Sequence, residues 1–304
     1  MDRLQLDKNA KLTGRVYFKD EVMWLGLSGS GASFTFDGTK LVLKLKGDNI
    51  AVGDNPIDYA RIAVYVDGKR VVDEMIDCAE KEVTVIDRTE SAKSVVEIIK
   101  LSESPMSAVG IEAFAEGSAE ALPEKPLKIE FIGDSITCGY GVDDEDENHQ
   151  FTTATEDVTK AYAYKTAKAL DAEYSMFSAS GYGIVSGYTE GDEPISEQTI
   201  PQFYCSYGFS RGNFAGTAPQ DIPWDFSKYI PQIIVINLGT NDDSYCRDHK
   251  DRQAVFSKLY ADFLAVVREK NPQAYILCTV GIMGERIFPA VEEGIKIYLK
   301  SHAD

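Results

Sequence analysis

The amino-acid sequence predicts two domains of different class, an all-β sandwich followed by a three-layer α/β/α domain. About the first 120 residues hold short β-rich runs and no periodic segment of helix length, whereas the rest alternates apolar strand-like runs with helical segments. Between the two, residues 116–126 are small and polar and are interrupted by prolines, which is typical of a linker. We therefore expect a β domain over residues 1–122 and an α/β domain over residues 123–304.

Composition excludes several classes of protein. At 304 residues the chain can bury two cores, and its 44% hydrophobic and 26% charged residues are typical of a globular protein. The formal net charge of −18, without a lysine- and arginine-rich stripe, argues against nucleic acid as a partner. No apolar run approaches the ~20 residues of a membrane span and the N-terminus lacks the apolar core of a secretory signal, so we expect no membrane partner and a cytoplasmic location. The five cysteines form no C-x-x-C pair, so we expect neither a disulfide framework nor zinc.

The expected β domain contains six short runs rich in β-branched and aromatic residues. Asp37-Gly38 and Asp67-Gly68 fall between neighbouring runs, where hairpin turns belong. Strands joined by tight turns pair antiparallel, so the pattern predicts an antiparallel sandwich. The six runs are residues 15–18, 32–36, 41–45, 60–66, 83–86 and 94–100.

The expected α/β domain contains four apolar strand-like runs separated by helical segments. This alternation favours a mostly parallel sheet covered on both faces, and ligands of such sheets bind beyond the carboxyl ends of the strands. Polar residues that follow the strands are therefore candidates for a site. The expected strands are residues 127–132, 172–178, 230–238 and 274–280, and the expected helices are residues 161–170, 253–270 and 287–302.

A serine follows the first of these strands directly. The strand stops at Gly133, Asp134 and Ser135, a turn of small residues at the expected start of a helix. There the Ser135 backbone N–H is free to face a developing oxyanion, and a helix N-terminus favours negative charge. Ser135 is therefore a candidate nucleophile for acyl transfer. The alternative is an ordinary strand-to-helix turn in which Asp134 or Ser135 is the N-cap.

Two further donors follow the second and third strands. Gly181 can bring a backbone N–H close to a reacting carbonyl, and Asn241 offers a neutral side-chain N–H. A serine with two such donors is what an oxyanion hole requires. As alternatives, Gly181 is a plain turn residue and Asn241 caps a loop.

These stretches resemble a known superfamily. Residues 133–137, 180–183 and 239–242 are similar to the first three sequence blocks of the SGNH (GDSL) hydrolases. The preceding β-rich domain and residues 223–227 resemble the two-domain carbohydrate esterases of family 2, the acetyl xylan esterase type. The resemblance implies a jelly-roll-like N-terminal domain, a flavodoxin-like α/β/α catalytic domain and removal of acetyl groups from plant polysaccharides or their oligosaccharides.

The resemblance also implies roles for individual residues. Ser135 would be the nucleophile, with the Ser135 N–H, the Gly181 N–H and Asn241 as the oxyanion donors. The expected partner is a small-molecule or oligosaccharide acetyl ester, no metal or organic cofactor is implied, and the oligomeric state stays open. The residues expected to contact the substrate are Asp134, Tyr182, Gly183 and Trp224.

One block of the superfamily has no counterpart. The superfamily carries its catalytic histidine in a late Asp-x-x-His segment, and attack by a neutral serine requires a base within hydrogen-bond reach. We expect His149 to lie in a solvated acidic loop, His249 on the surface and His302 at a helix end. The α/β domain is therefore expected to be incomplete at its C-terminus, with substrate binding and weak acyl transfer retained.

Three functions stay open on this sequence. The leading hypothesis is a serine esterase that acts on O-acetylated carbohydrate. The alternatives are a small-acyl esterase or thioesterase with a non-sugar substrate, and a carbohydrate-binding pseudoenzyme. A long insertion between the second and third strands is rich in aromatic residues, which either face a sugar or pack in the core. These residues are Tyr182, Tyr188, Tyr204, Tyr207, Phe209, Phe214 and Trp224.

Overall fold

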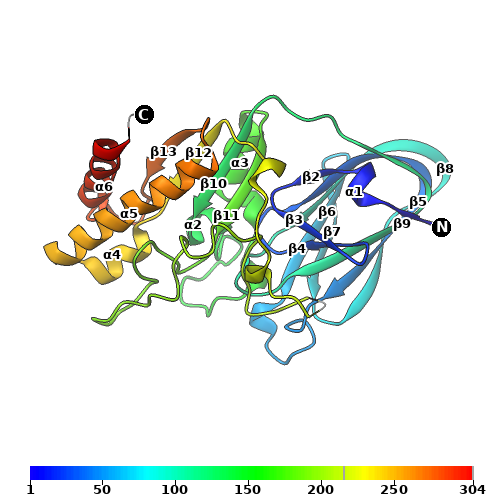
Figure 1. The fold of residues 1–304 in the computed structure, drawn as a ribbon. Helices are drawn as coiled ribbons and strands as arrows, with labels where there is room; N and C mark the ends of the chain where they lie inside the picture. Colours follow the sequence, from blue (N-terminus) through cyan, green and yellow to red (C-terminus); the bar gives the residue numbers. More distant parts are fainter. Residues whose placement is uncertain (215, 303–304) are drawn as a thin grey trace.

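Two domains lie side by side in the computed structural model, which describes residues 1–214 and 216–302 (Figure 1). The N-terminal domain is an antiparallel β-sheet structure, and the second domain carries a four-stranded parallel sheet with helices packed on it. The predicted fold class is therefore confirmed. No helix in the described part of the chain is both long enough and apolar enough to cross a membrane.

The N-terminal sheet has the strand order β3-β4-β9-β5-β8-β6-β7, with β1 added beside β9 and β2 beside β5. The long strands β5, β8 and β9 run through the domain, and their inward-facing apolar side chains form one core. The elements are β1 (Asp2–Leu4), α1 (Leu6–Asn9), β2 (Lys11–Thr13), β3 (Val16–Lys19), β4 (Val22–Leu25), β5 (Gly31–Gly47), the 3-10 helix η1 (Pro56–Asp58), β6 (Ala60–Val66), β7 (Lys69–Ile76), β8 (Glu80–Lys100) and β9 (Val109–Ala121).

One of the two expected hairpin turns is wrong. Asp67 and Gly68, with φ of 50° and 77°, do join β6 to β7. Asp37 and Gly38 instead lie inside the continuous strand β5, where the register shifts between Gly38 and Lys40. A Cβ at Gly38 would lie 2.3 Å from the Glu116 backbone oxygen, so glycine is needed here for close approach of the strands rather than for a turn.

The expected linker begins later than its composition indicates. Residues 116–121 belong to β9, which pairs antiparallel with β5 as far as the Phe34 and Ala121 positions. These residues are small and polar because this end of β9 is largely exposed, not because the chain is irregular. Residues 122–127 then lead into the second sheet.

The second domain has the parallel strand order β11-β10-β12-β13, and each expected strand and helix is found within a few residues of its predicted bounds. The elements are β10 (Lys128–Gly133), α2 (Ser135–Cys138), η2 (Thr153–Thr155), η3 (Val158–Lys160), α3 (Tyr162–Ala169), β11 (Glu173–Ser178), η4 (Pro219–Asp221), η5 (Phe226–Lys228), β12 (Ile233–Asn237), α4 (Thr240–Cys246), α5 (Lys250–Lys270), β13 (Tyr275–Thr279) and α6 (Phe288–Ser301).

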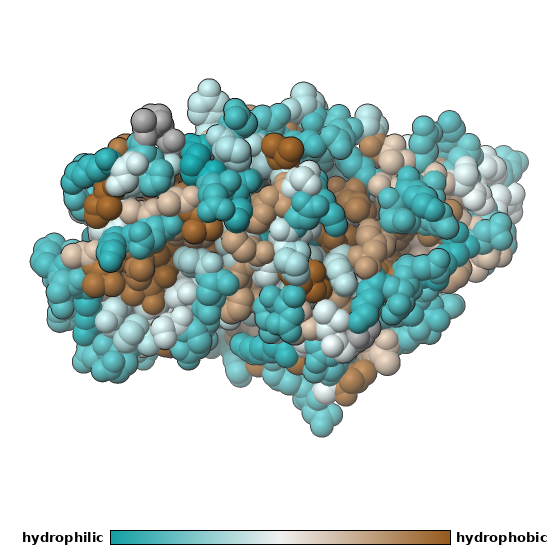
Figure 2. Space-filling model, viewed as in Figure 1, coloured by the Kyte–Doolittle hydropathy of each residue, from teal (hydrophilic) through white to brown (hydrophobic). Residues whose placement is uncertain are grey.

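The two faces of the parallel sheet are covered differently. One face packs against α5 and α6, through side chains such as Ile236, Tyr260 and Val291. The other face packs against α3 and against residues of the N-terminal domain, including Leu101. Apolar side chains also reach the surface around α5 and α6, where Val255 is 51% exposed (Figure 2).

The insertion between β11 and β12 packs against the N-terminal domain. The fully buried Arg15 donates to the backbone oxygens of Tyr204 and Ser206 and pairs with Glu130 of β10 at 3.3 Å. The Tyr207 hydroxyl donates to the backbone oxygen of Trp24 at 2.7 Å. Most of the aromatic residues of the insertion are buried, so core packing is their main role.

Candidate active site

The turn that carries Ser135 is built by its neighbours. Asp134 is the N-cap of α2, and its Oδ1 accepts a hydrogen bond from the Ile136 N–H at 3.1 Å. A Cβ at Gly133 would lie 2.0 Å from the Thr137 hydroxyl, so only glycine fits before the cap. Because α2 is a single turn of four residues, its dipole is small, and the free Ser135 N–H is the more important donor.

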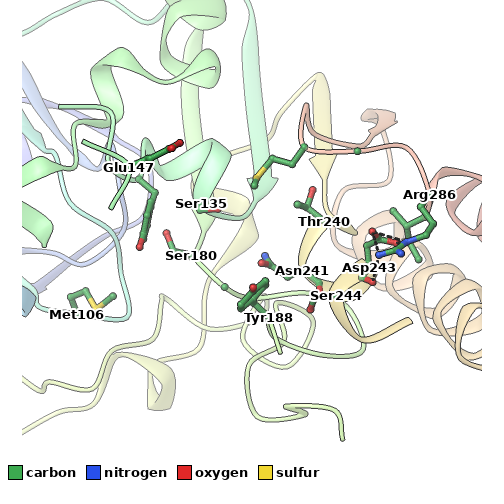
Figure 3. A pocket seen from close by; sticks show the side chains of 15 residues that line it. Met106, Ser135, Glu147, Ser180, Tyr188, Thr240, Asn241, Asp243, Ser244 and Arg286 are labelled. Atoms are coloured by element: carbon green, nitrogen blue, oxygen red, sulfur yellow. Dashed lines mark hydrogen bonds and ion pairs between the residues drawn. The ribbon is translucent and has the colours of Figure 1, made fainter. Parts of the chain in front are cut away.

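Ser135, Gly181 and Asn241 line one cavity of 880 Å³, as the sequence predicts for residues that act together (Figure 3). Ser135, Ser180 and Asn241 surround the same part of the cavity, while Asp243 and Arg286 form another part of its wall. The complete lining is Met106, Ser135, Tyr140, Glu147, Ser180, Gly181, Tyr188, Thr240, Asn241, Asp243, Ser244, Met283, Gly284, Arg286 and Ile287.

Each expected oxyanion donor has a hydrogen available. Within residues 1–214 and 216–302, neither the Ser135 N–H nor the Gly181 N–H has an acceptor. Asn241 uses one of its two amide hydrogens to donate from Nδ2 to the Tyr182 backbone oxygen at 2.8 Å, which leaves the second free. The site therefore has the three donors that an oxyanion hole requires.

A buried carboxylate next to Asn241 fixes the loop that carries Gly181. Asp242 accepts hydrogen bonds from the backbone N–H groups of Ile184, Val185 and Ser186 at 2.6 to 3.2 Å. No role for Asp242 was expected from the sequence. The only signal for one was its place beside Asn241, because its partners lie more than fifty residues away along the chain.

Two buried carboxyl groups near Ser135 have raised pKa values. Burial raises the pKa of Asp134 to about 7, and the charge of Asp242 adds to the rise. Burial raises the pKa of Asp242 to about 6, although its backbone N–H partners act in the opposite direction. Proton uptake in this region therefore falls within the neutral and mildly acidic range.

Several residues of the cavity wall were not expected from the sequence. Asp243 and Arg286 form an ion pair at 2.9 Å, which is drawn as dashed lines in Figure 3. Tyr140 stacks on Phe151 with ring centroids 4.1 Å apart and is 48% exposed. Met106 comes from the N-terminal domain, so both domains build the cavity.

The four residues expected to contact substrate do not line the cavity. Asp134 is fully buried as the N-cap of α2. The Tyr182 ring packs against Phe209 with centroids 5.1 Å apart, and Trp224 lies against the guanidinium of Arg15. A Cβ at Gly183 would lie 2.2 Å from the Ser186 backbone oxygen, so close packing rather than a ligand explains the glycine.

None of the three histidines lies on the wall of the cavity that holds Ser135, in the described part of the chain. The ring of His149 is 64% exposed and lies 2.9 Å from Asp144, His249 is the N-cap of α5, and His302 stacks on Tyr298. A histidine base is therefore not provided by these residues in this conformation.

One group of side chains among residues 1–214 and 216–302 has the spacing of a metal site. Donor atoms of Glu103, Cys138 and Glu156 all lie within 4.8 Å of one another and are buried. Burial raises the pKa of all three groups, and the Lys100 ammonium donates to the Glu103 backbone oxygen at 2.9 Å.

The comparison with protein families agrees with this geometry. Residues 131–297 match the model of the GDSL-like lipase/acylhydrolase family. The chain belongs to this family. Residues 12–126 match the model described as carbohydrate esterase 2 N-terminal, so this GDSL-family chain has the two-domain arrangement of family 2 carbohydrate esterases.

Curated relatives of this GDSL-family chain share its arrangement. It is 32% identical over 259 residues to cellulase/esterase CelE of Acetivibrio thermocellus, which covers 84% of this chain but only 29% of CelE. It is 29% identical over 282 residues to an acetylxylan esterase / glucomannan deacetylase of Cellvibrio japonicus, which covers 90% of this chain and 72% of that protein. The chain thus spans less than a third of the first of these relatives.

Solved structures share the fold of this GDSL-family chain. An acetyl xylan esterase from Butyrivibrio proteoclasticus has a TM-score of 0.88 at 21% identity, over 100% of this chain and 88% of that one. A family two carbohydrate esterase from Clostridium thermocellum, in complex with cellohexaose, has a TM-score of 0.78 at 27% identity, over 96% of this chain and 85% of that one.

Proposed function

We propose that the protein is a serine esterase that removes O-acetyl groups from carbohydrate, such as xylan or related oligosaccharides. The observation that carries the proposal is the cavity lined by Ser135, Gly181 and Asn241, with a free hydrogen on each expected donor. Membership of the GDSL-like family and the acetylxylan esterase names of its relatives support the same chemistry.

The reaction follows from the order of groups around Ser135. Its Oγ attacks the acetyl carbonyl carbon, and the carbonyl oxygen takes up the negative charge. The Ser135 N–H, the Gly181 N–H and the free hydrogen on Asn241 stabilise that charge. The ester C–O bond then breaks, and the sugar oxygen leaves as a hydroxyl after taking up the proton that Ser135 lost. Water attacks the acetyl carbonyl on Ser135, the bond to Oγ breaks, and acetate is released while Ser135 regains a proton.

The proton on Ser135 also has to be removed. Glu147 and Asp243 are the carboxylates on the described cavity wall, and Arg286 already pairs with Asp243. Oxyanion stabilisation accelerates acyl transfer even without an efficient base. The proposal therefore requires a measurable rate above that of a Ser135→Ala variant.

The cavity wall suits a sugar ester. Tyr140 and Tyr188 are 48% and 54% exposed and offer aromatic faces to sugar rings. Neutral and polar groups such as Ser180, Thr240 and Ser244 supply hydrogen-bond partners for hydroxyl groups. The cavity wall therefore offers an acetylated sugar both aromatic faces for its ring and polar groups for its hydroxyls.

Hydrolysis of p-nitrophenyl acetate tests the chemistry. We expect Ser135→Ala to reduce the rate to that of the uncatalysed reaction, because it removes the nucleophile. Ser196→Ala, at an exposed serine outside the cavity, is the matched control and should keep the wild-type rate. Equal rates for wild type and Ser135→Ala would remove the esterase proposal. Acetylated xylo-oligosaccharides compared with longer acyl esters then test the substrate.

A second candidate is carbohydrate binding without efficient catalysis. The observation that favours it is the lack of a histidine on the described part of the cavity wall. Calorimetric titration with cellohexaose, the ligand named for a related structure, tests this candidate. Binding by both wild type and Ser135→Ala, with no difference in their esterase rates, would favour a binding protein.

A further inference from the structure

Glu103 is a carboxylate of the N-terminal domain that reaches the loops of the active site. It lies between β8 and β9, in residues 101–108, which are all buried between the domains. Its Oε2 accepts a hydrogen bond from the Ser180 N–H at 2.5 Å. Ser180 immediately precedes Gly181, so this contact acts on the turn that presents the second oxyanion donor.

The same carboxylate oxygen also lies close to α2, the helix that begins with Ser135. The Cys138 thiol lies 3.8 Å from Glu103 Oε2 and 3.2 Å from the Ser178 hydroxyl. Cys138 belongs to α2, one turn after Ser135, and Ser178 ends β11. Glu103 thus contacts both elements whose separation sets the distance from the nucleophile to the Gly181 N–H.

Glu103 is itself held rigidly. Its backbone N–H donates to Glu156 Oε2 at 3.0 Å, and its backbone oxygen accepts from the Lys100 ammonium at 2.9 Å. Lys100, Glu103 and Glu156 are each fully buried. Burying ionisable side chains is costly unless their polar atoms are hydrogen-bonded or paired. The presence of these three at one domain junction therefore requires an explanation.

We propose that Glu103 is a positioning residue through which the N-terminal domain fixes the oxyanion turn relative to Ser135. Three contacts carry this inference: the bond to the Ser180 N–H, the approach to the Cys138 thiol, and the anchoring of Glu103 by Lys100 and Glu156. The N-terminal domain is then part of the catalytic apparatus. The kinetic part of the inference rests on the proposed esterase function.

Steady-state kinetics with p-nitrophenyl acetate test the role. A displacement of about 1 Å in a catalytic group costs on the order of 10²-fold, so we expect Glu103→Ala to lower kcat by about 10²-fold with KM almost unchanged. Glu103→Gln keeps an oxygen acceptor for the Ser180 N–H and should lose only about tenfold, because a neutral acceptor is weaker. This partial rescue separates positioning from general loss of packing.

Ser104→Ala is the matched control. Ser104 is equally buried in the same segment, but its hydroxyl donates to the Phe209 backbone oxygen and not to the oxyanion turn. It should lower the thermal midpoint without changing kcat by more than about threefold. An equal loss of kcat in Ser104→Ala and Glu103→Ala, or a wild-type kcat in Glu103→Ala, would overturn the inference.

Amide hydrogen exchange gives a readout that needs no activity. The Ser180 amide should exchange more slowly in wild type and Ser104→Ala than in Glu103→Ala, because only the last variant lacks its acceptor. If Glu103→Ala does not fold, the intermediate exchange of Glu103→Gln decides. Unchanged exchange in the Glu103 variants would refute positioning, whereas equal rates for wild type and Ser135→Ala would refute only the esterase function.

Discussion

The side-chain amide of Asn241 donates a hydrogen bond to the backbone oxygen of Tyr182, across 2.8 Å. This bond joins the first turn of α4 to the loop after β11. It leaves the second amide hydrogen of Asn241 available on the wall of the cavity that Ser135 and Gly181 also line. A single side chain therefore offers one of the proposed oxyanion donors and helps to hold the loop that carries another.

Asn241→Ala should lower kcat on p-nitrophenyl acetate by about 10²–10³-fold, because it removes an oxyanion donor. KM should change little, since the lost interaction strengthens only as charge develops. Ser196→Ala, outside the cavity, serves as the control. A kcat for Asn241→Ala close to that of wild type would show that the amide does not face the reacting oxygen.

Gly181 and Gly183 should respond differently to substitution by alanine. A Cβ at Gly183 would lie 2.2 Å from the Ser186 backbone oxygen and 2.6 Å from Asp242 Oδ2, so Gly183→Ala should cost about 3 kcal/mol of unfolding free energy. At Gly181 the nearest atom is 4.0 Å away, and only its φ of 80° is unfavourable, so Gly181→Ala should cost about 1 kcal/mol. Urea unfolding of both variants checks the order, and the reverse order would contradict the packing described for Gly183.

Buried Asp134 should make stability depend on pH. Its pKa is raised from 3.8 to about 7 in the folded protein, so between these values the folded state binds more protons than the unfolded state. The contribution of Asp134 to the free energy of unfolding is therefore greatest at low pH and is lost as pH rises from about 4 to about 7. Relative to wild type, Asp134→Asn should gain stability over this interval.

Urea unfolding at several values between about pH 4 and about pH 8 measures this difference. The interval covers the pKa of Asp134 in the unfolded and in the folded state. Asp171→Asn is the control, because a hydrogen bond from Lys125 lowers the pKa of Asp171 below its usual value. Its difference from wild type should be flat above about pH 5. A flat difference for Asp134→Asn as well would mean that its carboxyl is not protonated preferentially in the folded state.

Loss of Arg15 should destabilise the junction of the two domains. Arg15→Met leaves Glu130 without its buried cation and removes the donors to the Tyr204 and Ser206 backbone oxygens. Breaking such a buried pair costs about 3–5 kcal/mol, which urea unfolding would detect. Lys125→Ala, which breaks an exposed pair with Asp171, should leave stability almost unchanged. Equal, small effects in both variants would mean that Arg15 does not stabilise the domain junction.

Patterns of neighbouring residues predicted part of the structure correctly and part of it wrongly. The alternation of strands and helices after residue 127 predicted the parallel sheet, because each strand and helix is set by residues close together in the chain. The Gly-Asp-Ser turn, Gly181 and Asn241 were predicted for the same reason, since each follows a strand end. The Asp37-Gly38 turn was predicted wrongly because glycine at a bulge and glycine in a hairpin have the same local sequence.

The sequence by itself determined the two fold classes and the three strand ends that are followed by Ser135, Gly181 and Asn241, because periodicity and turn residues act over a few neighbouring positions. Only the tertiary structure decided that Glu103 of the first domain meets the Ser180 N–H of the second, 77 positions away. Only it placed Gly183 in close packing and Trp224 against Arg15. Such contacts form between residues that are far apart in the sequence and come together only when the domains pack. A local sequence pattern therefore does not predict them.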